Sequence, residues 1–519
     1  MKNTLFERLL EYYQIDKEQY EKLIAPVSID SFSDGHSFKG MEDAVKLVKK
    51  SIQDKDKIFI YGDYDADGIM STSIVARSIL LLGVIPSYYI PNRYLDGYGI
   101  TLEKAQKIVE QKFNLVITVD NGISAFEAID YLKEHGVKVL IIDHHQVQET
   151  VPPADAILHP QYSEFGETPS SAGFVSFMFS WALLGYFNKY LSIMAAISLI
   201  SDMMPLVSYN RDFLRLVFSS YKDGEFYQID LLKEGQSFDE TAIGLKIAPK
   251  INALGRLIDD TSINNIVKFF VNTDREKTAK LLNWIVETNE QRKLESKFAA
   301  ENMPKVNEKE SAIIVKTDSK EGLLGLIANQ ICSIYHKPTI VFTEERDGDV
   351  LKGSCRAPEG FNVVDAFNYC KDIIITSGGH ALAGGCSIKK EDFDSFKNKF
   401  IEYSENNPVQ VVLHDYVQLG LNEINEENYD IIQSFSPFGE GWRSPEFIMK
   451  HIKTDSLMFS KTGEHILTYV GQGVKLVGFG FAKNDVQECK YVDLVGKIKK
   501  TSYKGQTSLE YSIKDVLES

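Results

Sequence analysis

The sequence predicts an α/β protein in four parts: a parallel-sheet domain, a long connecting helix, a second and smaller α/β domain, and a C-terminal β-barrel. Three observations support this fold class. Apolar runs alternate with helical stretches in the first part of the chain, a long charged helical stretch follows, and short β-like runs dominate from residue 409 onward. Because 519 residues are too many for one core, we expect domains at 1–272, 273–307, 308–406 and 407–519.

Composition limits the possible functions. A net charge of −16 is not that of a general polyanion binder, so a nucleic-acid partner would be held by local basic patches or metal ions. The five cysteines are odd in number and never spaced C-x-x-C, which argues against a disulfide framework or zinc site and favours a reducing cytoplasm. The most apolar stretch, 174–187, is too short to span a bilayer, so we expect no membrane association.

The most informative stretch runs from Ile58 to Gly68, where an apolar run of strand character ends in aspartates at alternate positions. If the backbone stays extended, Asp63, Asp65 and Asp67 point to the same side. Like charges this close repel one another unless a cation lies among them, and oxygen ligands suit Mg²⁺, Mn²⁺ or Ca²⁺. An EF-hand loop is excluded, because its twelfth position would be Ile74 instead of Glu. A solvated acidic turn is the alternative for this stretch taken alone.

The following elements repeat this pattern. Strands at 115–119 and 137–142 end in Asp120 and in Asp143-His144-His145, and a helix at 191–200 is followed by Asp202. Ligands bind outside the carboxyl ends of parallel strands, so these side chains should converge at one edge of the sheet. A single Asp after a strand is more often a helix cap, but the joint pattern favours a site. The other elements expected here are helices at 41–52, 69–82 and 101–112, a strand at 86–91 and a loop at 92–99.

The two neighbouring histidines need a separate interpretation. Adjacent residues of an extended chain face opposite ways, so His144 and His145 should not bind one ion from one face. We expect one imidazole to be a metal ligand and the other to touch substrate. The alternative is a structural pair, which would need hydrogen-bond partners at the end of a buried strand.

The second half of the chain predicts a connecting helix and two further domains. The charged helix at 273–303 has too irregular an apolar seam for a coiled coil, so it should span two domains. Strands are expected at 312–315, 339–342 and 352–356, helices at 322–335 and 362–370, and a loop at Gly378–His380 whose backbone N–H groups could meet phosphate.

The barrel should contain strands at 411–413, 446–449, 466–469, 475–481, 491–498 and 508–513. Lysines cluster near its end, interleaved with aromatic residues: Lys490, Tyr491, Lys497, Lys499, Lys500, Tyr503 and Lys504. Such a cluster either binds a single strand by charge and stacking or belongs to a solvated edge strand.

Four stretches resemble, in order, the motifs of the DHH phosphoesterase family: Gly62–Gly68, Val119–Gly122, Asp143–His145 and Ser201-Asp202. Four later ones are similar to its RecJ branch: Ala248–Arg256, Gly353–Arg356, Ser377–Gly385 and Ser436–Gly441. The resemblance covers roughly residues 40–519. Residues before 40 are not clearly alike, and Trp442-Arg443-Ser444-Pro445 replaces the usual Asn-Pro pair. These departures concern the N-terminal contacts and accessory interactions, not the chemistry.

The resemblance implies a metal-dependent exonuclease that degrades single-stranded DNA from the 5′ end to 5′-mononucleotides, in DNA repair and recombination. It also implies an OB-fold for the barrel. The expected partners are single-stranded DNA, a single-strand-binding protein and a helicase, and the expected state is a cytoplasmic monomer. The cofactors would be two divalent ions, Mn²⁺ or Mg²⁺.

The resemblance also suggests roles for individual residues. Asp120 would bridge the ions, His145 would contact the scissile phosphate, and Asp143 would orient His144 and complete the catalytic set. The expected metal ligands are Asp63, Asp65, Asp67, Asp120, His144 and Asp202. The expected DNA-binding residues are Arg93, Asn252, Arg256, Ser354, Arg356, Gly379 and His380.

Three other functions compete with this interpretation. DHH oligonucleotide or cyclic-dinucleotide phosphodiesterases share the metal motifs but lack an OB-fold, so the β-rich tail argues against them. Catalytically inactive replication scaffolds have lost metal-binding acids that this chain retains. An inorganic pyrophosphatase would carry His where this chain has Tyr61.

Overall fold

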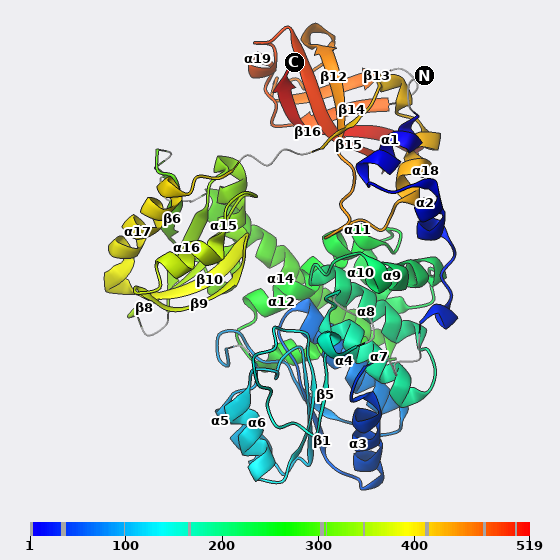
Figure 1. Ribbon diagram of the computed structural model, residues 1–519, viewed down its shortest axis with the longest axis vertical. Coiled ribbons are helices and arrows are strands. Elements are labelled where there is room, and N and C mark those ends of the chain that lie inside the picture. Colours follow the sequence, from blue (N-terminus) through cyan, green and yellow to red (C-terminus); the bar gives the residue numbers. More distant parts are fainter. Residues whose placement is uncertain are drawn as a thin grey trace. The chain divides into compact units, whose positions relative to one another are not determined.

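The computed structural model describes residues 4–32, 38–97, 99–163, 168–301, 306–307, 309–345, 348–410, 415–470, 474–503 and 506–519. The chain divides into two compact units. One contains Ile29–Met204 and the chain from Val217 through the second α/β domain, and the other contains the N-terminal residues through Ser28, Pro205–Leu216 and the C-terminal barrel. Three sheets within these units confirm the predicted fold class (Figure 1).

The first sheet is parallel throughout, with the strand order β2-β1-β3-β4-β5. Its strands are β1 (Ile58–Tyr61), β2 (Ser87–Tyr89), β3 (Leu115–Val119), β4 (Lys138–Ile142) and β5 (Ala156–Leu158). In the register, Val119 lies opposite Ile142, and Ile142 lies opposite Leu158. The strands therefore end together, which places the residues that follow them along one edge.

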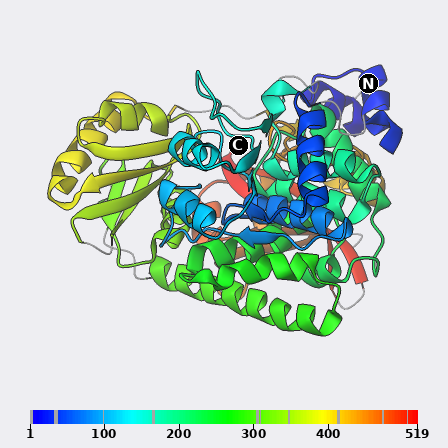
Figure 2. The same cartoon turned by 90° about the horizontal axis from the view of Figure 1, so that it is seen from below.

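Helices cover both faces of this sheet (Figure 2). On one face, α5 (Leu102–Glu110) and α6 (Phe126–Glu134) pack their apolar sides against alternate residues of β3 and β4. On the other face lie α4 (Ala66–Leu81), α7 (Ala172–Leu184) and α8 (Lys189–Ser201), which contact one another and are buried almost all round. Because these three helices are core elements, their ends are held firmly where they meet the sheet edge.

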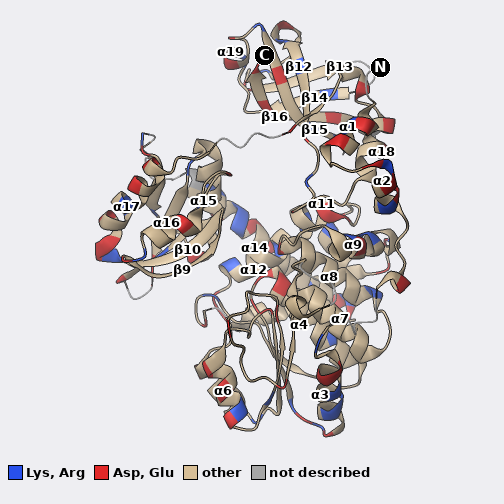
Figure 3. Cartoon of the chain, viewed as in Figure 1, with Lys and Arg blue, Asp and Glu red and all other residues tan. Residues whose placement is uncertain are grey.

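The rest of the first unit connects the sheet to the second α/β domain. The connecting elements are α10 (Tyr227–Lys233), α12 (Ala248–Leu257), α13 (Asn265–Val271) and the long α14 (Arg275–Glu301). α3 (Met41–Gln53) instead packs on α7 and β5, and the division into two units falls within α9 (Ser208–Ser220). Figure 3 shows Lys and Arg alternating with Asp and Glu along surface helices such as α3, α6 and α17 (Phe393–Asn406). Within the described ranges, no helix combines the length and apolar character needed to cross a membrane.

The second domain contains a mixed sheet in the order β6-β7-β8-β10-β9. Its strands are β6 (Ile313–Lys316), β7 (Thr339–Glu344), β8 (Val350–Arg356), β9 (Ile374–His380) and β10 (Ala383–Lys389). α15 (Glu321–Tyr335) packs on one face of β6 and β7, whereas α16 (Val363–Tyr369) and α17 pack on the opposite face.

The prediction of a loop at the glycine-rich stretch Gly378–His380 is wrong. This stretch forms the end of β9 and pairs with β10, with Gly379 opposite Gly384. A Cβ on Gly379 would lie only 2.4 Å from the carbonyl oxygen of Ala383, and its φ is +146°. The glycine is therefore required by the close strand pairing.

The barrel has the strand order β11-β12-β15-β16-β14-β13. Its strands are β11 (Val417–Gln418), β12 (Phe447–Lys453), β13 (His465–Val470), β14 (Val474–Phe479), β15 (Tyr491–Tyr503) and β16 (Gln506–Glu518), with α18 (Glu426–Ser434) and α19 (Lys483–Val486) between them. The expected strand at 411–413 and Lys504 lie outside the described residues. Lys497 and Lys500 form ion pairs with Glu446 (3.8 Å) and Glu426 (2.6 Å), so part of the lysine cluster is neutralised within the protein.

The N-terminal helices α1 (Leu5–Tyr12) and α2 (Lys17–Ile24) belong to the barrel unit. Leu5 and Leu9 join its core, and the Tyr13 ring stacks on Trp442 with a centroid distance of 4.5 Å. This differs from the domain boundaries expected from the sequence, which place these residues with the parallel sheet. Their amphipathic pattern indicates only that they need an apolar surface, and the structure supplies that surface from the barrel.

Candidate metal centre and anion pocket

The turn between β1 and α4 carries the first acids. Asp63 is buried, and Asp65 caps α4 by accepting a 3.1 Å hydrogen bond from the Gly68 N–H. A Cβ on Gly68 would lie 2.6 Å from the Asp63 Cβ, so the closeness of this turn requires glycine. The expectation that Asp63, Asp65 and Asp67 share one side of an extended chain is wrong, because the Asp65 cap starts the helix and puts Asp67 in its first turn.

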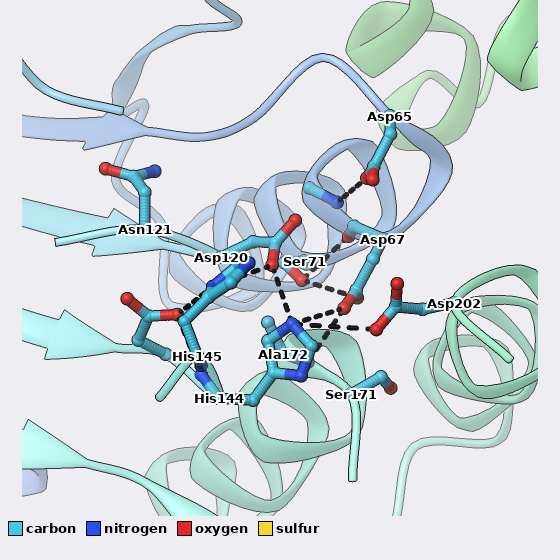
Figure 4. Close-up of polar contacts among 12 residues, drawn as sticks. Asp65, Asp67, Ser71, Asp120, Asn121, His144, His145, Ser171, Ala172 and Asp202 are labelled. Carbon is cyan, nitrogen blue, oxygen red and sulfur yellow. Dashed lines mark hydrogen bonds and ion pairs between the residues drawn. The ribbon is translucent and has the colours of Figure 1, made fainter. Parts of the chain in front are cut away.

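Asp67 is held by donors from two other helices (Figure 4). Its carboxylate accepts hydrogen bonds from Ala172 N (2.9 Å), Gly173 N (2.8 Å) and Ser198 Oγ (2.6 Å). Ala172 and Gly173 begin α7, where unpaired N–H groups and the helix dipole favour a negative charge. Asp67 therefore ties α4 to α7 and to α8, and α8 ends next to Asp202.

This arrangement predicts that Asp67→Ala lowers the free energy of unfolding of the metal-free protein by roughly 3 kcal/mol, because buried donors lose their acceptor. Urea denaturation at pH 5 measures the change, because the Asp202 carboxyl is protonated there and is not repelled by Asp67. Asp43, an exposed acid in the first turn of α3, is the matched control, and its replacement by Ala should cost less than about 1 kcal/mol. Equal losses in the two variants would contradict the tying role of Asp67.

Asp120 follows β3 in a left-handed conformation with φ +60°, which is uncommon for a residue other than glycine. The next residue, Asn121, fixes this bend: its Nδ2 donates to the carbonyl oxygens of Gly62 (3.0 Å) and Val119 (2.9 Å). As a result, Asp120 Oδ1 lies 3.1 Å from His144 Nε2. The bend thus joins the acid after β3 to the imidazole after β4.

The Asp143–His145 segment corrects two expectations. The first is that Asp143 orients His144, whereas Asp143 Oδ1 lies 2.7 Å from His145 Nδ1. The second is that the chain stays extended, with the two rings on opposite sides. Instead, the chain turns after β4, because Asp143 accepts hydrogen bonds from the backbone N–H groups of both histidines. The two rings therefore do not face opposite ways: their ligand nitrogens and an Asp120 oxygen all lie within 4.8 Å of one another.

The two imidazoles differ in their protonation. Burial lowers the pKa of His144, so its ring is neutral at pH 7 and suits metal ligation. For His145, burial acts in the same direction, but the hydrogen bond to Asp143 outweighs it and raises the pKa to about 9. In return, the His145 contact holds the pKa of Asp143 below its usual value in spite of burial. The contact with Asp143 therefore favours the protonated, cationic form of His145, which suits an anionic substrate.

The acids at this edge cannot all be charged without a counter-ion. Burial, and next the charge of Asp67, raises the pKa of Asp202 to about 9. Burial and neighbouring carboxylates likewise raise the pKa of Asp63 and of Asp120 well above its usual value. Asp63 Oδ1 is also buried, and no hydrogen-bond donor among the described residues reaches it. A cation would reduce the repulsion among the carboxylates and would give this oxygen a positively charged partner.

The donor set fits divalent ions. Three groups have ligand atoms within 4.8 Å of one another: Asp63, Asp65 and Asp120; Asp67, His144 and Asp202; and Asp120, His144 and His145. Asp120 and His144 each belong to two groups, and Figure 4 shows Asp67, Asp120 and Asp202 around the His144 ring. Carboxylate oxygens with imidazole nitrogen suit Mn²⁺, and the oxygens alone suit Mg²⁺.

Sequence reasoning missed His159, which follows β5. Its ring is buried, with Nε2 2.8 Å from the His145 carbonyl oxygen and Nδ1 accepting from the Gln161 N–H at 3.2 Å. His159 therefore fixes the backbone that carries His145. The available signal was the short apolar run 156–158, which is followed directly by a histidine.

A cavity of about 730 Å³ lies between α12, the first turns of α15 and the strands β8, β9 and β10, and three arginines line it. Burial lowers the pKa of Arg256 to about 10, and the neighbouring Arg93 and Arg356 add to this effect. Arg93 also stacks over the Tyr64 ring at 4.4 Å, which places it beside the β1–α4 turn. Three guanidinium groups facing one cavity indicate an anion site.

The structure brings together four of the seven expected DNA-binding residues, because Ser354 joins the three arginines in this cavity. The other three have different surroundings. Asn252 Oδ1 accepts a 2.8 Å hydrogen bond from the Ala66 N–H, so it supports the start of α4. Gly379 and His380 belong to the β9 pairing, and it is their neighbour Gly378 that lines the cavity.

Comparisons with known proteins agree with this architecture. Residues 57–201 match the model of the DHH family, N-terminal domain; residues 309–406 match the DHHA1 domain; and residues 417–515 match the RecJ OB domain. The single-stranded-DNA-specific exonuclease RecJ of Bacillus subtilis is 30% identical over 98% of this chain and 67% of its own length. The corresponding protein of Haemophilus influenzae is 30% identical over 81% of this chain and 79% of its own.

The fold likeness extends over nearly the whole chain. The crystal structure of RecJ from Thermus thermophilus in complex with Mn²⁺ matches with a TM-score of 0.85 at 22% identity, covering 99% of this chain and 76% of that one. Together, the three domain matches and the extent of the similarity to the two curated relatives show that this chain belongs to the RecJ family of DHH proteins.

Proposed function

We propose that this protein is a metal-dependent exonuclease that degrades single-stranded DNA from the 5′ end and releases 5′-mononucleotides. The observation that carries the proposal is the presence, in one unit, of an acid–imidazole cluster and a cavity lined by three arginines. The relatives named as single-stranded-DNA-specific exonucleases support the substrate, and the RecJ structures with Mn²⁺ and with Mg²⁺ support the cofactors.

The metal site would use the ligands inferred from the sequence: Asp63, Asp65, Asp67, Asp120, His144 and Asp202. Divalent ions bound there would activate a water and stabilise the charge that develops on the phosphate oxygens. Asp120 would hold the metal centre together, since it is the acid that has ligand atoms close both to Asp63 and Asp65 and to the two histidines. Asp67 has the additional task of holding α7 and α8 against α4.

His145 acts on the substrate phosphate in this proposal. Its imidazolium, held by Asp143 at Nδ1, presents the second ring nitrogen to the scissile phosphate and gives a proton to the leaving 3′-oxygen. His145 lines two cavities, of about 600 and 650 Å³, so its ring borders open space. His159 keeps the ring in place through the His145 carbonyl.

The arginine-lined cavity would recognise the chain end. Arg93, Arg256 and Arg356 supply guanidinium forks that match phosphate oxygens, and Ser354 adds a hydroxyl group. Binding of the terminal 5′ phosphate here would place the first internucleotide bond near the metal centre, because Arg93 packs on Tyr64 between Asp63 and Asp65.

The proposal also covers the compartment, the oligomeric state and the partners of the enzyme. We place it in the cytoplasm as a monomer that acts in DNA repair and recombination, with a single-strand-binding protein and a helicase as candidate partners. The five free cysteines, four of them buried, support a reducing compartment.

Digestion of 5′- and 3′-labelled single strands with Mn²⁺ tests the function. We expect the 5′ label to be released first, as a mononucleotide, with little attack on a duplex. A dinucleotide substrate included in the same series separates a long-strand exonuclease from a small-oligonucleotide phosphodiesterase. Earlier release of the 3′ label, or a strong preference for the dinucleotide, would contradict the proposal.

A further inference from the structure

The arginine-lined cavity has a second end, lined by Lys352, Thr376 and Ser387. They come from β8, β9 and β10, and the strand register puts Lys352 opposite Ser387 and Ser387 opposite Thr376. The two hydroxyl oxygens lie 2.9 Å apart. We call this row the Lys352 subsite.

Between the arginines and the Lys352 subsite, the sheet forms a floor with few side chains. The row consists of Ser354, Gly385 and Gly378, which lie opposite one another on the three strands. A Cβ on Gly378 would meet nothing within 4 Å, and the nearest atom to a Cβ on Gly385 would be at 3.6 Å. The glycines therefore leave open space above the strands, and the two ends of the cavity communicate across them.

The size of the cavity exceeds what one phosphate needs. Its volume is about 730 Å³, and a water takes about 30 Å³ in the liquid, so the cavity has room for roughly 24 waters. Lys352 and Arg356 lie on the same side of β8 four residues apart, which separates their Cα atoms by about 13 Å. A single phosphate bound by Arg356 therefore leaves the Lys352 subsite for a further group.

The lining indicates the chemistry of that further group. Lys352, Thr376, Ser377 and Ser387 offer a cation and hydroxyl groups. Among the described residues that line the cavity, Glu321 is the one acid, set against four cationic side chains, and there is no aromatic ring. A nucleobase would find no stacking surface here, whereas phosphate oxygens would find donors. Lys352 is held by a 3.6 Å ion pair with the half-exposed Glu345, a contact loose enough for the ammonium group to turn to a ligand at small cost.

We propose that the Lys352 subsite binds the additional phosphates of a 5′-di- or triphosphorylated strand, so that the enzyme degrades such strands directly. This inference rests on the proposed function. Water would attack the phosphorus between the first two nucleotides, and the bond to the 3′-oxygen of the first nucleotide would break. That oxygen would take the proton, the first nucleotide would leave as a nucleoside 5′-triphosphate, and the remaining strand would carry the 5′ phosphate.

The test uses one single strand prepared with a 5′-monophosphate, a 5′-triphosphate or a 5′-hydroxyl end. With the unaltered protein and Mn²⁺, we expect the triphosphorylated strand to be degraded within roughly threefold of the monophosphorylated rate, with a nucleoside 5′-triphosphate as first product. Lys352→Ala should lower the ratio of the triphosphate rate to the monophosphate rate by roughly tenfold, the value of one charge-assisted contact.

Two other variants show whether the effect is specific to Lys352. Lys389→Ala removes a lysine from the end of β10 whose side chain is 62% exposed and does not line the cavity, and it should leave the ratio unchanged. Arg356→Ala should slow both phosphorylated strands. Resistance of the triphosphorylated strand to the unaltered protein, or an equal effect of Lys352→Ala on both strands, would overturn the inference. Failure to degrade the monophosphorylated strand would instead refute the proposed function itself.

Discussion

Asp120→Asn removes nuclease activity: we expect the turnover rate on a 5′-labelled single strand to fall by roughly three orders of magnitude. The substitution keeps the size of the side chain and removes its charge. Asp120 lies 3.1 Å from His144 and belongs to two of the three possible metal groups, so its loss affects the whole centre. Among the described residues, no other side chain belongs both to the group with Asp63 and Asp65 and to the group with the two histidines.

Two measurements check this prediction. Turnover with saturating Mn²⁺ gives the loss of activity, and the metal content of the dialysed protein shows whether binding is lost with it. Asp130→Asn, which alters an exposed acid on α6, is the matched control and should change neither quantity. Retained activity together with a normal metal content would remove Asp120 from the centre.

The metal-free protein loses stability as the pH rises from about 5 to about 9. Asp202 has a pKa of about 9 in the folded protein and an ordinary value of 3.8, so between these values the folded state binds more protons than the unfolded state. The free energy of unfolding then falls with pH, by up to about 1.4 kcal/mol per unit for one such group. His145 acts in the same direction: its pKa is raised from 6.5 to about 9, so its contribution is present below 6.5 and lost through 9.

Chemical denaturation with a chelator at a series of pH values measures this slope, and comparison with Asp202→Asn isolates the contribution of one carboxyl group. Mn²⁺ replaces the protons, so the stabilisation it provides should grow as the pH rises. If the chelated protein were more stable at pH 9 than at pH 6, and Asp202→Asn did not alter the slope, the crowding of the acids would not be a stability determinant.

The parallel sheet, its ligand-bearing edge and most of the site follow from the amino-acid sequence. The apolar runs that form β1, β3 and β4 are buried on both faces, a pattern typical of parallel sheets. Once the strands are parallel, the acids and histidines that follow them must share one edge. The convergence of Asp120 and His144 was therefore predictable without any knowledge of loop paths, whereas Asp202 reaches them from the end of α8.

The partner that each side chain meets emerges from the three-dimensional packing alone. Asp143 holds His145 instead of His144, Asp67 receives the N–H groups of α7, and α1 packs on the barrel. The physical reason is that sequence patterns are local, whereas most of these contacts join residues far apart in the chain. Periodicity reports which face of an element is apolar, whereas these contacts depend on the course of turns and on distant chain segments that supply the donor or the apolar surface.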